Sequence, residues 1–471
     1  MAPPRRDDDL PIAALLAPDI LALLDEAPAD VAAETEEMHP ADLADVAAAI
    51  PRERVADLLL ALGTDRAADV LEYLDEELRT EALETMSARQ AAQLVSAMTP
   101  DDRADVLEEL EEDVADEILS AIPAEARQET ERLLAYEPDT AGGLMTTEFV
   151  SVPSEQRVEE ALASVRAMAR SGRREAMYTI YATDAQGRVA GVLSLRELLA
   201  AAEGTTVGDV AWSEVVTVPA TASREEIAAV TAKYDLVAVP VVDEGARLLG
   251  VVTVDDVIDI IQEQQTEDVQ RLGGMEALDD PYMQTGFFTL LRKRAGWLTV
   301  LFIGEMMTAV AMQNFEHEIA RAAVLALFIP LIIASGGNSG SQATSLLIRA
   351  IALREVRLRD WWKVAMRELP SGLLLGTLLG LLGLVRVVAW QELGLYDHGP
   401  HYWAIGVTVM LALVGVVTFG TIVGAMLPFV LKRFGLDPAS ASAPLVATLV
   451  DVTGLVIYFS LALLLLRGTL L

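Results

Sequence analysis

The sequence predicts a multidomain protein with an all-α superhelical N-terminal domain, an α/β domain made of two copies of one module, and a polytopic α-helical membrane domain with five transmembrane helices. Three observations support this fold class. The 471 residues divide near Thr285 into a strongly acidic half and an apolar half. Short helical units recur before residue 137, and a strand and helix pattern occurs twice after Met145. Five long apolar segments then follow.

The negative charge of the chain belongs to its first half. Residues 1–286 contain 61 acidic and 21 basic residues, whereas residues 287–471 contain 10 acidic and 14 basic residues. Such a surface repels nucleic acid and attracts cations wherever carboxylates converge, although it also serves solubility alone. Cysteine is absent and the four histidines lack zinc-like spacing, which excludes disulfides and argues against zinc sites. We therefore expect cations, and no nucleic acid, as partners.

The first 137 residues are expected to be mostly helical. Residues 1–30 are expected to form a flexible N-terminal segment, as chain termini often do, and Pro18 interrupts their apolar patch, which argues against a signal peptide. In residues 31–137 the sequence DRAADVLEYL, which begins at Asp65, returns as DRADVLEEL from Asp102. Short helices with repeated apolar faces stack into a superhelix, which is the fold expected for this domain.

Residues 138–262 show alternating strands and helices in two copies. The sequence AGVLSLRELL from Ala190 matches LGVVTVDDVI from Leu249, and FVSVP from Phe149 matches VVTVP from Val215. Each copy resembles a CBS module, and two such modules normally form one α/β domain.

The resemblance to CBS modules implies a nucleotide site. The positions of Thr253 and Asp256 would face the ribose and phosphate of an adenosine nucleotide such as ATP. Glu197 replaces the aspartate in the first copy, which disfavours a site there. The chain has no GxxxxGK[ST] loop, so we expect neither hydrolysis nor another enzymatic activity.

A polar helix is expected from Asp255 to about Tyr282, and its part at residues 263–286 connects the α/β domain to the membrane domain at residues 287–471. Two pairs of aspartates share a helix face before the membrane domain. In one of these pairs, Asp256 and Asp259 are three residues apart. Like charges at such spacings cost a few tenths of a kcal/mol unless a cation bridges them.

The second pair is Asp101 and Asp105, which lie four residues apart in the helical domain. A divalent ion that bridged carboxylates of different domains would turn their repulsion into attraction. The sequence therefore allows a cation-dependent contact between domains.

Five apolar segments of about 20 residues predict five transmembrane helices. They are residues 296–313, 322–347, 369–389, 404–427 and 443–466. Basic residues gather before the first, between the second and third, and between the fourth and fifth segments, whereas the alternate loops contain few. By the positive-inside rule we expect the N-terminal domains in the cytosol, the C-terminus outside, and the protein in the cytoplasmic (inner) membrane.

Polar residues lie deep in the first two apolar segments. The second contains GGNSGSQ from Gly336 to Gln342, in which Gly337 permits close backbone approach and Asn338 needs a protein or water partner. This stretch either packs helices or lines a cavity. In the first segment, Glu305 is a pore carboxylate, a protonated donor between helices, or a partner of the glycine-rich stretch, and the sequence does not choose among these roles.

The fifth segment carries one carboxylate, Asp451. A charge in a bilayer-spanning helix costs about 2.5 to 3.5 kcal/mol on insertion scales, so it usually faces a pore or a partner. At helical spacing one face carries Pro444, Thr448, Asp451, Gly454 and Tyr458. This face resembles a water-lined wall, and a two-fold axis along a pore would bring two copies of Asp451 together. A hydrogen bond from Asp451 to another helix is the simpler alternative.

From residue 31 to residue 471 the chain resembles the MgtE family of magnesium channels. The resemblance rests on YEPDTAGGLM from Tyr136, on GGNSGSQ from Gly336, on the segment from Pro444 to Gly454, and on the order of the parts. It implies a homodimer in the lipid bilayer with one central pore. The helical N domain, the CBS pair and the connecting (plug) helix would lie on its cytosolic side.

The resemblance also implies roles for single residues. Asp451 matches the aspartate that holds a hydrated Mg²⁺ in the pore, and Ala447 matches a position that offers its carbonyl there. The implied pore lining further includes Asn338, Gly336, Gly337, Thr448 and Pro444. The implied regulatory Mg²⁺ ligands are Glu225, Asp235, Asp256, Asp259, Glu267, Asp268, Asp437 and the Ala232 carbonyl, with Asp101 and Asp105 from the N domain.

Two departures from the family pattern bear on regulation and on the pore. Gln264 stands where a sensor glutamate is expected, which removes a charge and should weaken the closed state. Ala443 stands where a polar pore residue is common, which should make the cytosolic mouth less hydrophilic.

The expected function is that of a magnesium-selective ion channel for influx, closed when cytosolic Mg²⁺ bridges the acidic interfaces. The alternative is a secondary-active divalent cation transporter coupled to H⁺ or Na⁺ through Glu305. A membrane-anchored energy sensor without transport is a third possibility, but it gives Asp451 no role.

Overall fold

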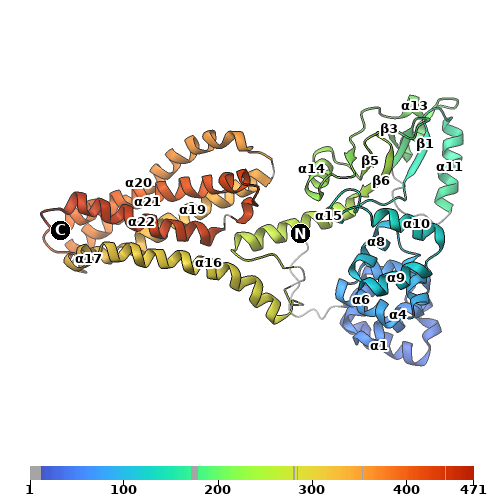
Figure 1. The fold of residues 1–471 in the computed structure, drawn as a ribbon, viewed down its shortest axis with the longest axis horizontal. Coiled ribbons are helices and arrows are strands. Elements are labelled where there is room, and N and C mark those ends of the chain that lie inside the picture. Colours follow the sequence, from blue (N-terminus) through green and yellow to red (C-terminus); the bar gives the residue numbers. More distant parts are fainter. Residues whose placement is uncertain are drawn as a thin grey trace. The chain divides into compact units, whose positions relative to one another are not determined.

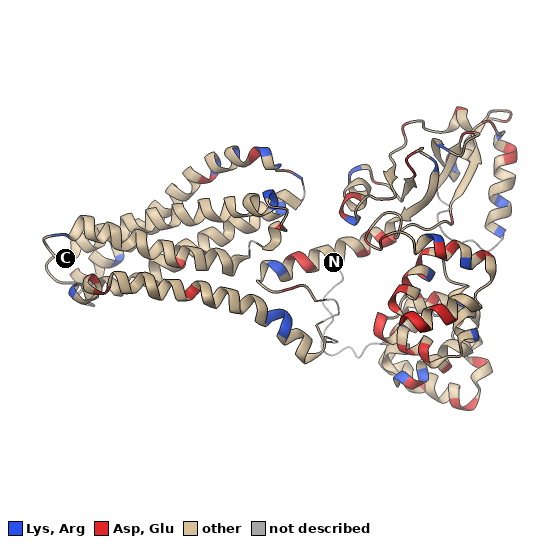
Figure 2. Ribbon diagram, viewed as in Figure 1, with Lys and Arg blue, Asp and Glu red and all other residues tan. Residues whose placement is uncertain are grey.

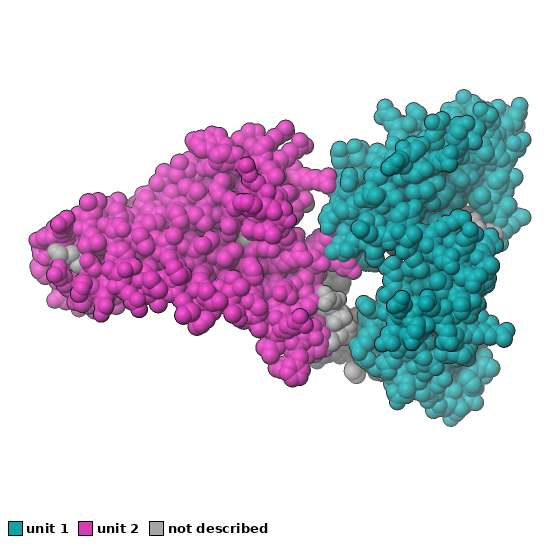
Figure 3. Space-filling model, in the orientation of Figure 1, with its two compact units in different colours: residues 1–261 teal, residues 262–471 magenta. Residues whose placement is uncertain are grey.

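A computed structural model describes residues 12–170, 179–278, 282–283, 285–352, 354–440 and 442–470. The chain divides into two compact units, residues 1–261 and residues 262–471 (Figure 3). The first unit contains the helical domain and two small sheets, and the second contains the long apolar helices. This multidomain fold class confirms the prediction from the sequence.

The N-terminal part of the first unit is entirely helical in its described residues (Figure 1). Its helices are α1 (Ile12–Glu26), η1 (Pro28–Asp30), α2 (Val31–Glu34), α3 (Pro40–Ala49), η2 (Arg52–Arg54), α4 (Val55–Leu62), α5 (Thr64–Glu72), α6 (Glu76–Thr85), α7 (Ala88–Val95), α8 (Pro100–Glu109), α9 (Glu112–Ala121) and α10 (Ala124–Leu133). Leucines such as Leu43, Leu59 and Leu71 are fully buried where these helices stack. The apolar helix faces that the repeated sequence predicted therefore form one continuous core.

The prediction that residues 1–30 form a flexible segment is wrong for Ile12–Glu26, which forms α1. The buried face of α1 consists of Ala13, Ala17, Ile20 and Leu24. These residues recur every three or four positions and join the core that α3 also buries. Pro18 lies inside the helix, so the gain from this apolar face outweighs the cost of the proline.

The α/β part contains two three-stranded sheets of the same topology. Its elements are β1 (Val150–Pro153), α11 (Val158–Arg170), β2 (Thr179–Thr183), β3 (Val189–Ser194), α12 (Leu195–Ala200), α13 (Val207–Val210), β4 (Val218–Pro219), α14 (Arg224–Tyr234), β5 (Ala238–Val242), β6 (Leu248–Thr253) and α15 (Val254–Leu272). In each sheet the first strand runs parallel to the second, and the third runs antiparallel to the second. This duplication confirms the predicted pair of modules.

The hairpins of the two sheets pair with each other. The backbone N–H of Val189 donates to the carbonyl of Ala246 at 3.1 Å. In each hairpin an aspartate accepts a backbone N–H across the turn: Asp184 from Arg188 at 2.9 Å, and Asp243 from Arg247 at 2.8 Å. The two turns are therefore equivalent in structure.

The connecting helix is shorter than the sequence predicted. α15 ends at Leu272, and Gly274 follows with φ of +75°, a left-handed conformation that commonly stops helices. The helix expected from Asp255 to about Tyr282 is thus wrong beyond Leu272 in the described residues, which exclude 279–281 and 284. The glycine pair at 273–274 explains the early stop.

Among its described residues, the second unit contains five helical spans that are long and apolar enough to cross a membrane, as predicted. Its elements are α16 (Phe287–Asn314), α17 (Glu316–Arg321), α18 (Ala323–Ala326), α19 (Ile329–Ala352), η3 (Leu358–Asp360), α20 (Trp361–Glu392), α21 (Tyr402–Arg433), η4 (Pro438–Ser440) and α22 (Ala443–Leu466). Charged residues are frequent on the first unit and sparse along these long helices (Figure 2).

α19 and α21 pack through glycines. A Cβ atom at Gly340 would lie 2.9 Å from the Gly420 carbonyl oxygen, and Gly420 itself lies directly against the Gly336 carbonyl. The Thr344 hydroxyl donates to the Gly424 carbonyl at 2.8 Å. Backbone contact of this kind replaces the hydrophobic effect, which does not drive helices together in lipid.

Replacing Ala246 by glycine is expected to stabilise the protein by about 0.5 to 1 kcal/mol. Ala246 holds φ of +60°. This left-handed conformation costs an alanine about 1 to 2 kcal/mol, and the greater entropy of glycine in the unfolded chain offsets part of the gain. The midpoint of urea unfolding, followed in the first unit of the full chain, measures the effect.

The matched control is Gly187→Ala, because Gly187 occupies the equivalent turn position with φ of +77°. This change should lower the midpoint. Equal midpoints for both variants and the wild type would show that the two turns carry no strain.

Candidate metal sites

The first unit brings the start of α8 beside the start of α15. Ala104 of α8 packs in one apolar cluster with Met145 and with residues of the second sheet and its helices, such as Val252 and Val257. Arg103 fixes α8 from within, because its buried guanidinium donates to the Met98 carbonyl at 3.0 Å and to the Thr130 hydroxyl at 3.3 Å. The carboxylates at these two helix ends are therefore held close together.

Six carboxylates from three helices interact there, hereafter the acidic cluster. They are Glu72 of α5, Asp101, Asp102 and Asp105 of α8, and Asp255 and Asp256 of α15. The sequence predicted three of them, Asp101, Asp105 and Asp256, and missed the others. The only available signal for Asp102 and Asp255 was their position next to predicted ligands, and Glu72 had none.

The acidic cluster contains uncompensated negative charge. Burial, and then repulsion from Asp101, raises the pKa of Asp256 to about 8. The same two causes raise the pKa of Asp105 to about 7, although its side chain keeps contact with solvent. At neutral pH such a group of carboxylates is stabilised by protons or by a bound cation.

Asp101 is the most buried member of the acidic cluster. It is 7% exposed, and its Oδ1 atom has no hydrogen-bond partner among the described residues. Burial, and then Asp102, raises the pKa of Asp101. A buried carboxylate oxygen without a partner is costly, and carboxylate oxygens are the ligands that Mg²⁺ prefers. Asp101 Oδ1 could therefore accept a cation, although no three of the described carboxylates are arranged in this structure to hold a metal ion.

Asp256 is bonded at the start of α15, where the Thr253 hydroxyl donates to its Oδ2 atom at 2.6 Å. At the equivalent position of the first copy the Ser194 hydroxyl donates to Glu197 Oε2 at 2.9 Å, and the Trp212 indole donates to Glu197 Oε1 at 2.8 Å. Ser194 and Glu197 form a capping box at α12. The nucleotide role of Thr253 and Asp256 stays a prediction.

A second group of acids surrounds Arg271 in the second unit. Arg271 forms ion pairs with Asp437 and, at 3.2 Å, with Glu267. Burial, and then Asp437, raises the pKa of Asp268. Leu272 packs against Ile348 of α19 and Ala439 of η4, which fastens the end of α15 to the membrane helices. The resemblance implied all three acids as ligands within a longer set, and did not include their cationic partner.

The other predicted regulatory ligands are not brought together. Glu225 lies in the first turn of α14, whereas Asp235 caps its C-terminus, about 15 Å along the helix. Ala232 lies near Asp235. Asp259 lies one turn after Asp255 on α15, where burial and then Asp255 raise its pKa. Among the described residues, no three acidic or histidine side chains are arranged to hold a metal ion.

Asp451 lies on α22 beside Glu305 of α16, and the two carboxylates interact electrostatically. Asp451 is half-buried. Gly304 permits the close approach of α16, because a Cβ atom there would lie 2.7 Å from Thr448 Cγ2. The Thr448 hydroxyl donates to the Pro444 carbonyl at 3.0 Å, within its own helix. Glu305 therefore belongs to the same polar region as Asp451.

The predicted pore-lining residues on α19 differ in their surroundings. Asn338 is exposed, and Gly337 faces Ala447, with 3.5 Å between the two Cβ positions. Gly336 instead faces α21, where its Cβ would lie 2.6 Å from Val416 Cγ1. Gly336 therefore allows α19 and α21 to pack closely, because a larger residue would clash at this contact. It does not line an open surface.

The segment after α15 contacts the first turn of α22. A Cβ atom at Gly274 would lie 3.2 Å from Pro444 Cγ and 2.9 Å from Trp297 Nε1. The Trp297 indole donates to Ser442, the residue that caps α22, at 3.2 Å. The start of the helix that carries Asp451 is thus covered by the end of the connecting segment.

Family models match three parts of this chain. The model of the MgtE intracellular N domain matches residues 38–139, the CBS domain matches 141–204 and 207–263, and the divalent cation transporter MgtE matches 329–461. A magnesium transporter MgtE from Thermus thermophilus is 44% identical over 342 residues, which cover 73% of each chain. The chain belongs to the MgtE family.

Two further comparisons agree with MgtE membership. A magnesium transporter MgtE from Enterococcus faecalis is 34% identical over 343 residues, or 72% of each chain. A crystal structure of the soluble part of a magnesium transporter superposes with a TM-score of 0.50 at 29% identity, and covers 54% of this chain and 99% of that one. The resemblance stated from the sequence motifs is confirmed.

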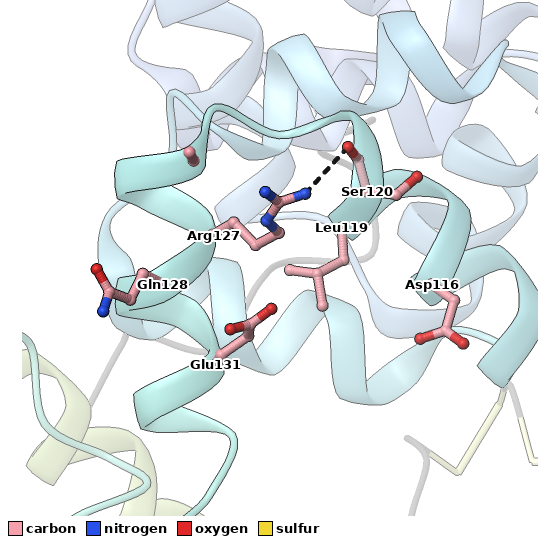
Figure 4. A pocket seen from close by; sticks show the side chains of 7 residues that line it. Asp116, Leu119, Ser120, Arg127, Gln128 and Glu131 are labelled. Carbon is pink, nitrogen blue, oxygen red and sulfur yellow. Dashed lines mark hydrogen bonds between the residues drawn. The ribbon is translucent and has the colours of Figure 1, made fainter.

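A surface hollow in the MgtE N domain does not fit a cation. It measures about 560 Å³ between α9 and α10 (Figure 4). Its lining residues are Asp116, Leu119, Ser120, Ala124, Arg127, Gln128 and Glu131. Arg127 lies among them and donates to the Ser120 carbonyl at 3.4 Å, so the hollow already contains a positive charge.

Without divalent cations, the first unit of the full-length protein is expected to become less stable as the pH rises from about 4 to about 8. Folding raises the pKa of Asp105 and Asp256. The folded chain therefore binds more protons than the unfolded chain in this range, and stability is lost as the protons leave. The loss should be about 1 kcal/mol or more after solvent screening, as calorimetry would measure, and Mg²⁺ should oppose it.

Asp256→Asn should flatten this pH dependence, because it removes one repelling charge and keeps an oxygen for Thr253. Glu117→Gln, on an exposed position of α9 outside the acidic cluster, should leave it unchanged. A wild-type unfolding temperature that rises between pH 5 and 8 would contradict the assignment.

Proposed function

We propose that this protein carries Mg²⁺ into the cytosol through a central pore formed by two copies of the chain. The observation that carries the proposal is Asp451, a carboxylate on an apolar helix beside Glu305. It lies inside the segment that matches the divalent cation transporter family, and the relatives are named magnesium transporters. The basic loops support a membrane orientation with the N-terminal domains in the cytosol and the C-terminus outside.

Conduction follows from the properties of a carboxylate pair. Two copies of Asp451 on a dimer axis would attract Mg²⁺, which gives up its water reluctantly and would pass with waters retained. Weak binding through water permits release, as conduction requires. The membrane potential drives each positive charge inward by about 2.3 kcal/mol per 100 mV. Ala447, Asn338, Gly337, Thr448 and Pro444 would complete the wall.

Gating follows from the cytosolic acids. In the proposed scheme Mg²⁺ binds the acidic cluster and the acids around Arg271 in the closed state, and stabilises that state relative to the open one. The contacts of Gly274 with Pro444 and Trp297 support this scheme, since they place the connecting segment over the start of α22. At low cytosolic Mg²⁺ the carboxylates repel and the segment is released.

The second candidate is secondary-active transport coupled to H⁺ or Na⁺. The proximity of Glu305 to Asp451 favours it, because a second carboxylate offers a site for the coupling ion.

We also propose that an adenosine nucleotide binds at Thr253, where it would add to the regulation by Mg²⁺. These two proposals leave the position of the Mg²⁺ pathway unchanged.

Asp451→Asn is expected to reduce Mg²⁺ current by at least about tenfold, which corresponds to about 1.4 kcal/mol of lost attraction for the ion. Wild-type currents in patches should reverse at the Mg²⁺ equilibrium potential whatever the pH or sodium concentration. A reversal potential that follows protons or sodium would support the coupled transporter instead.

The matched control for Asp451 is Glu316→Gln, which neutralises an exposed acid of α17 in the same domain. It should keep wild-type current. Full current in Asp451→Asn would refute the pore assignment.

Removal of the residues before Tyr282 is expected to leave a channel that no longer closes in millimolar Mg²⁺, because every proposed regulatory carboxylate except Asp437 is then absent. Mg²⁺ would be applied to the cytosolic side of excised patches, with the full chain as control. Inhibition that survives the truncation would refute the gating scheme.

A further inference from the structure

One histidine of the membrane domain is buried. His398 lies in the loop between α20 and α21, is 5% exposed, and has no hydrogen-bond partner for Nδ1 among the described residues. Its backbone N–H donates to Gln391 Oε1 at 2.6 Å, which fixes the loop at this point. His401 in the same loop and His317 in α17 are exposed. The transport scheme uses none of the three.

The ring of His398 stacks on an aromatic residue at the start of a pore-domain helix. Its centroid lies 6.1 Å from that of Phe328, with 24° between the planes, and 4.8 Å from that of Tyr396. Phe328 is fully buried. The guanidinium carbon of Arg386 lies 5.4 Å from the centroid of the Phe328 ring and 4.2 Å from that of Trp390. The arginine and the histidine therefore both lie against the Phe328 ring.

The charged groups near His398 oppose its protonation on balance. Arg386 faces it from α20, and Asp397 precedes it in the loop. Asp397 accepts hydrogen bonds from the Gly399 N–H at 2.8 Å and from Gln391 Nε2 at 3.1 Å, which spreads its charge. Glu392 is engaged by the Tyr402 hydroxyl. Burial, and then Arg386, lowers the pKa of His398 against the smaller effect of Asp397.

The histidine stack supports a turn that two pore helices share. The Phe328 N–H donates to the Leu325 carbonyl at 3.1 Å, and Phe328 leads directly into α19. The Tyr458 hydroxyl of α22 donates to the same carbonyl at 2.9 Å. Tyr458 is buried and lies two turns beyond Asp451 on the same face. A change at Phe328 thus reaches both α19 and α22.

We propose that His398 is a proton-sensitive positioning residue for transport. In its neutral form the ring stacks on Phe328 and holds the turn at Leu325 against α22. Protonation places a second cation beside Arg386 in a buried aromatic site, opens the stack, and lowers Mg²⁺ flux in acidic medium. The inference rests on the proposed transport function and concerns a site remote from Asp451.

The test compares Mg²⁺ flux into proteoliposomes at about pH 7.5 and about pH 5.0, with equal pH on both sides so that orientation does not matter. The lower value lies at the acidic end of the histidine range because the pKa of His398 is lowered. His398→Phe keeps an aromatic ring and cannot be protonated. It should retain most of its flux at the lower pH, whereas the wild type and the matched control His401→Gln should lose most of theirs. Titration of Asp451 affects all variants equally and cancels in the comparison.

Equal acid sensitivity in the wild type and His398→Phe would overturn the proposal. If His398→Phe unfolds at a lower temperature than the wild type, His398→Gln is decisive instead. It should carry less Mg²⁺ at neutral pH and lose no more in acid, and an acid loss equal to that of the wild type would refute the role of His398. Absence of wild-type flux at neutral pH would refute the transport function itself.

Discussion

The repulsion between carboxylates is the constraint on which this molecule depends. The acidic cluster holds six of them on α5, α8 and α15, and buried Asp101 has an oxygen without a hydrogen-bond partner. Apolar packing around Ala104 and the buried Arg103 hold these helices together despite that repulsion. A cation bound among these carboxylates would reduce their repulsion. Because the free energy of folding is a small difference between large opposing contributions, even partial binding of a cation would change it.

The two units differ in the cations that lie next to their carboxylates. In the first unit Arg79 lies near Asp102 but forms its ion pair with Glu109, so protons or cations from the medium must neutralise most of the charge of the acidic cluster. In the second, Arg271 is a built-in cation that pairs with Asp437 and Glu267. An arginine in this position reduces the negative charge that remains available to a cation.

Much of the architecture was predictable because the patterns are long and periodic. The five spans and the duplicated module that contains Thr253 follow from hydrophobicity and repetition alone. The sequence did not predict α1, because Pro18 interrupts the apolar pattern of this segment. It also did not predict that α15 ends at Leu272. Residues that depend on contacts distant in sequence were also missed, such as Glu72 in the acidic cluster and Arg271 beside Asp437. Such contacts arise from tertiary packing, which cannot be inferred from a single sequence without an alignment.

The direct backbone contact between α19 and α21 limits how the membrane domain moves. Gly336 and Gly340 face Gly420 and Gly424 with no side chains between them, so the two helices cannot slide past each other or rotate without a clash. They form one stiff mechanical element. Motion within the membrane domain must therefore occur at the borders of this pair, where Ala447 of α22 meets Gly337, and between α22 and α16, where Thr448 lies against Gly304. Such motion would leave the backbone contacts between α19 and α21 intact, so these contacts need not be broken in each transport cycle.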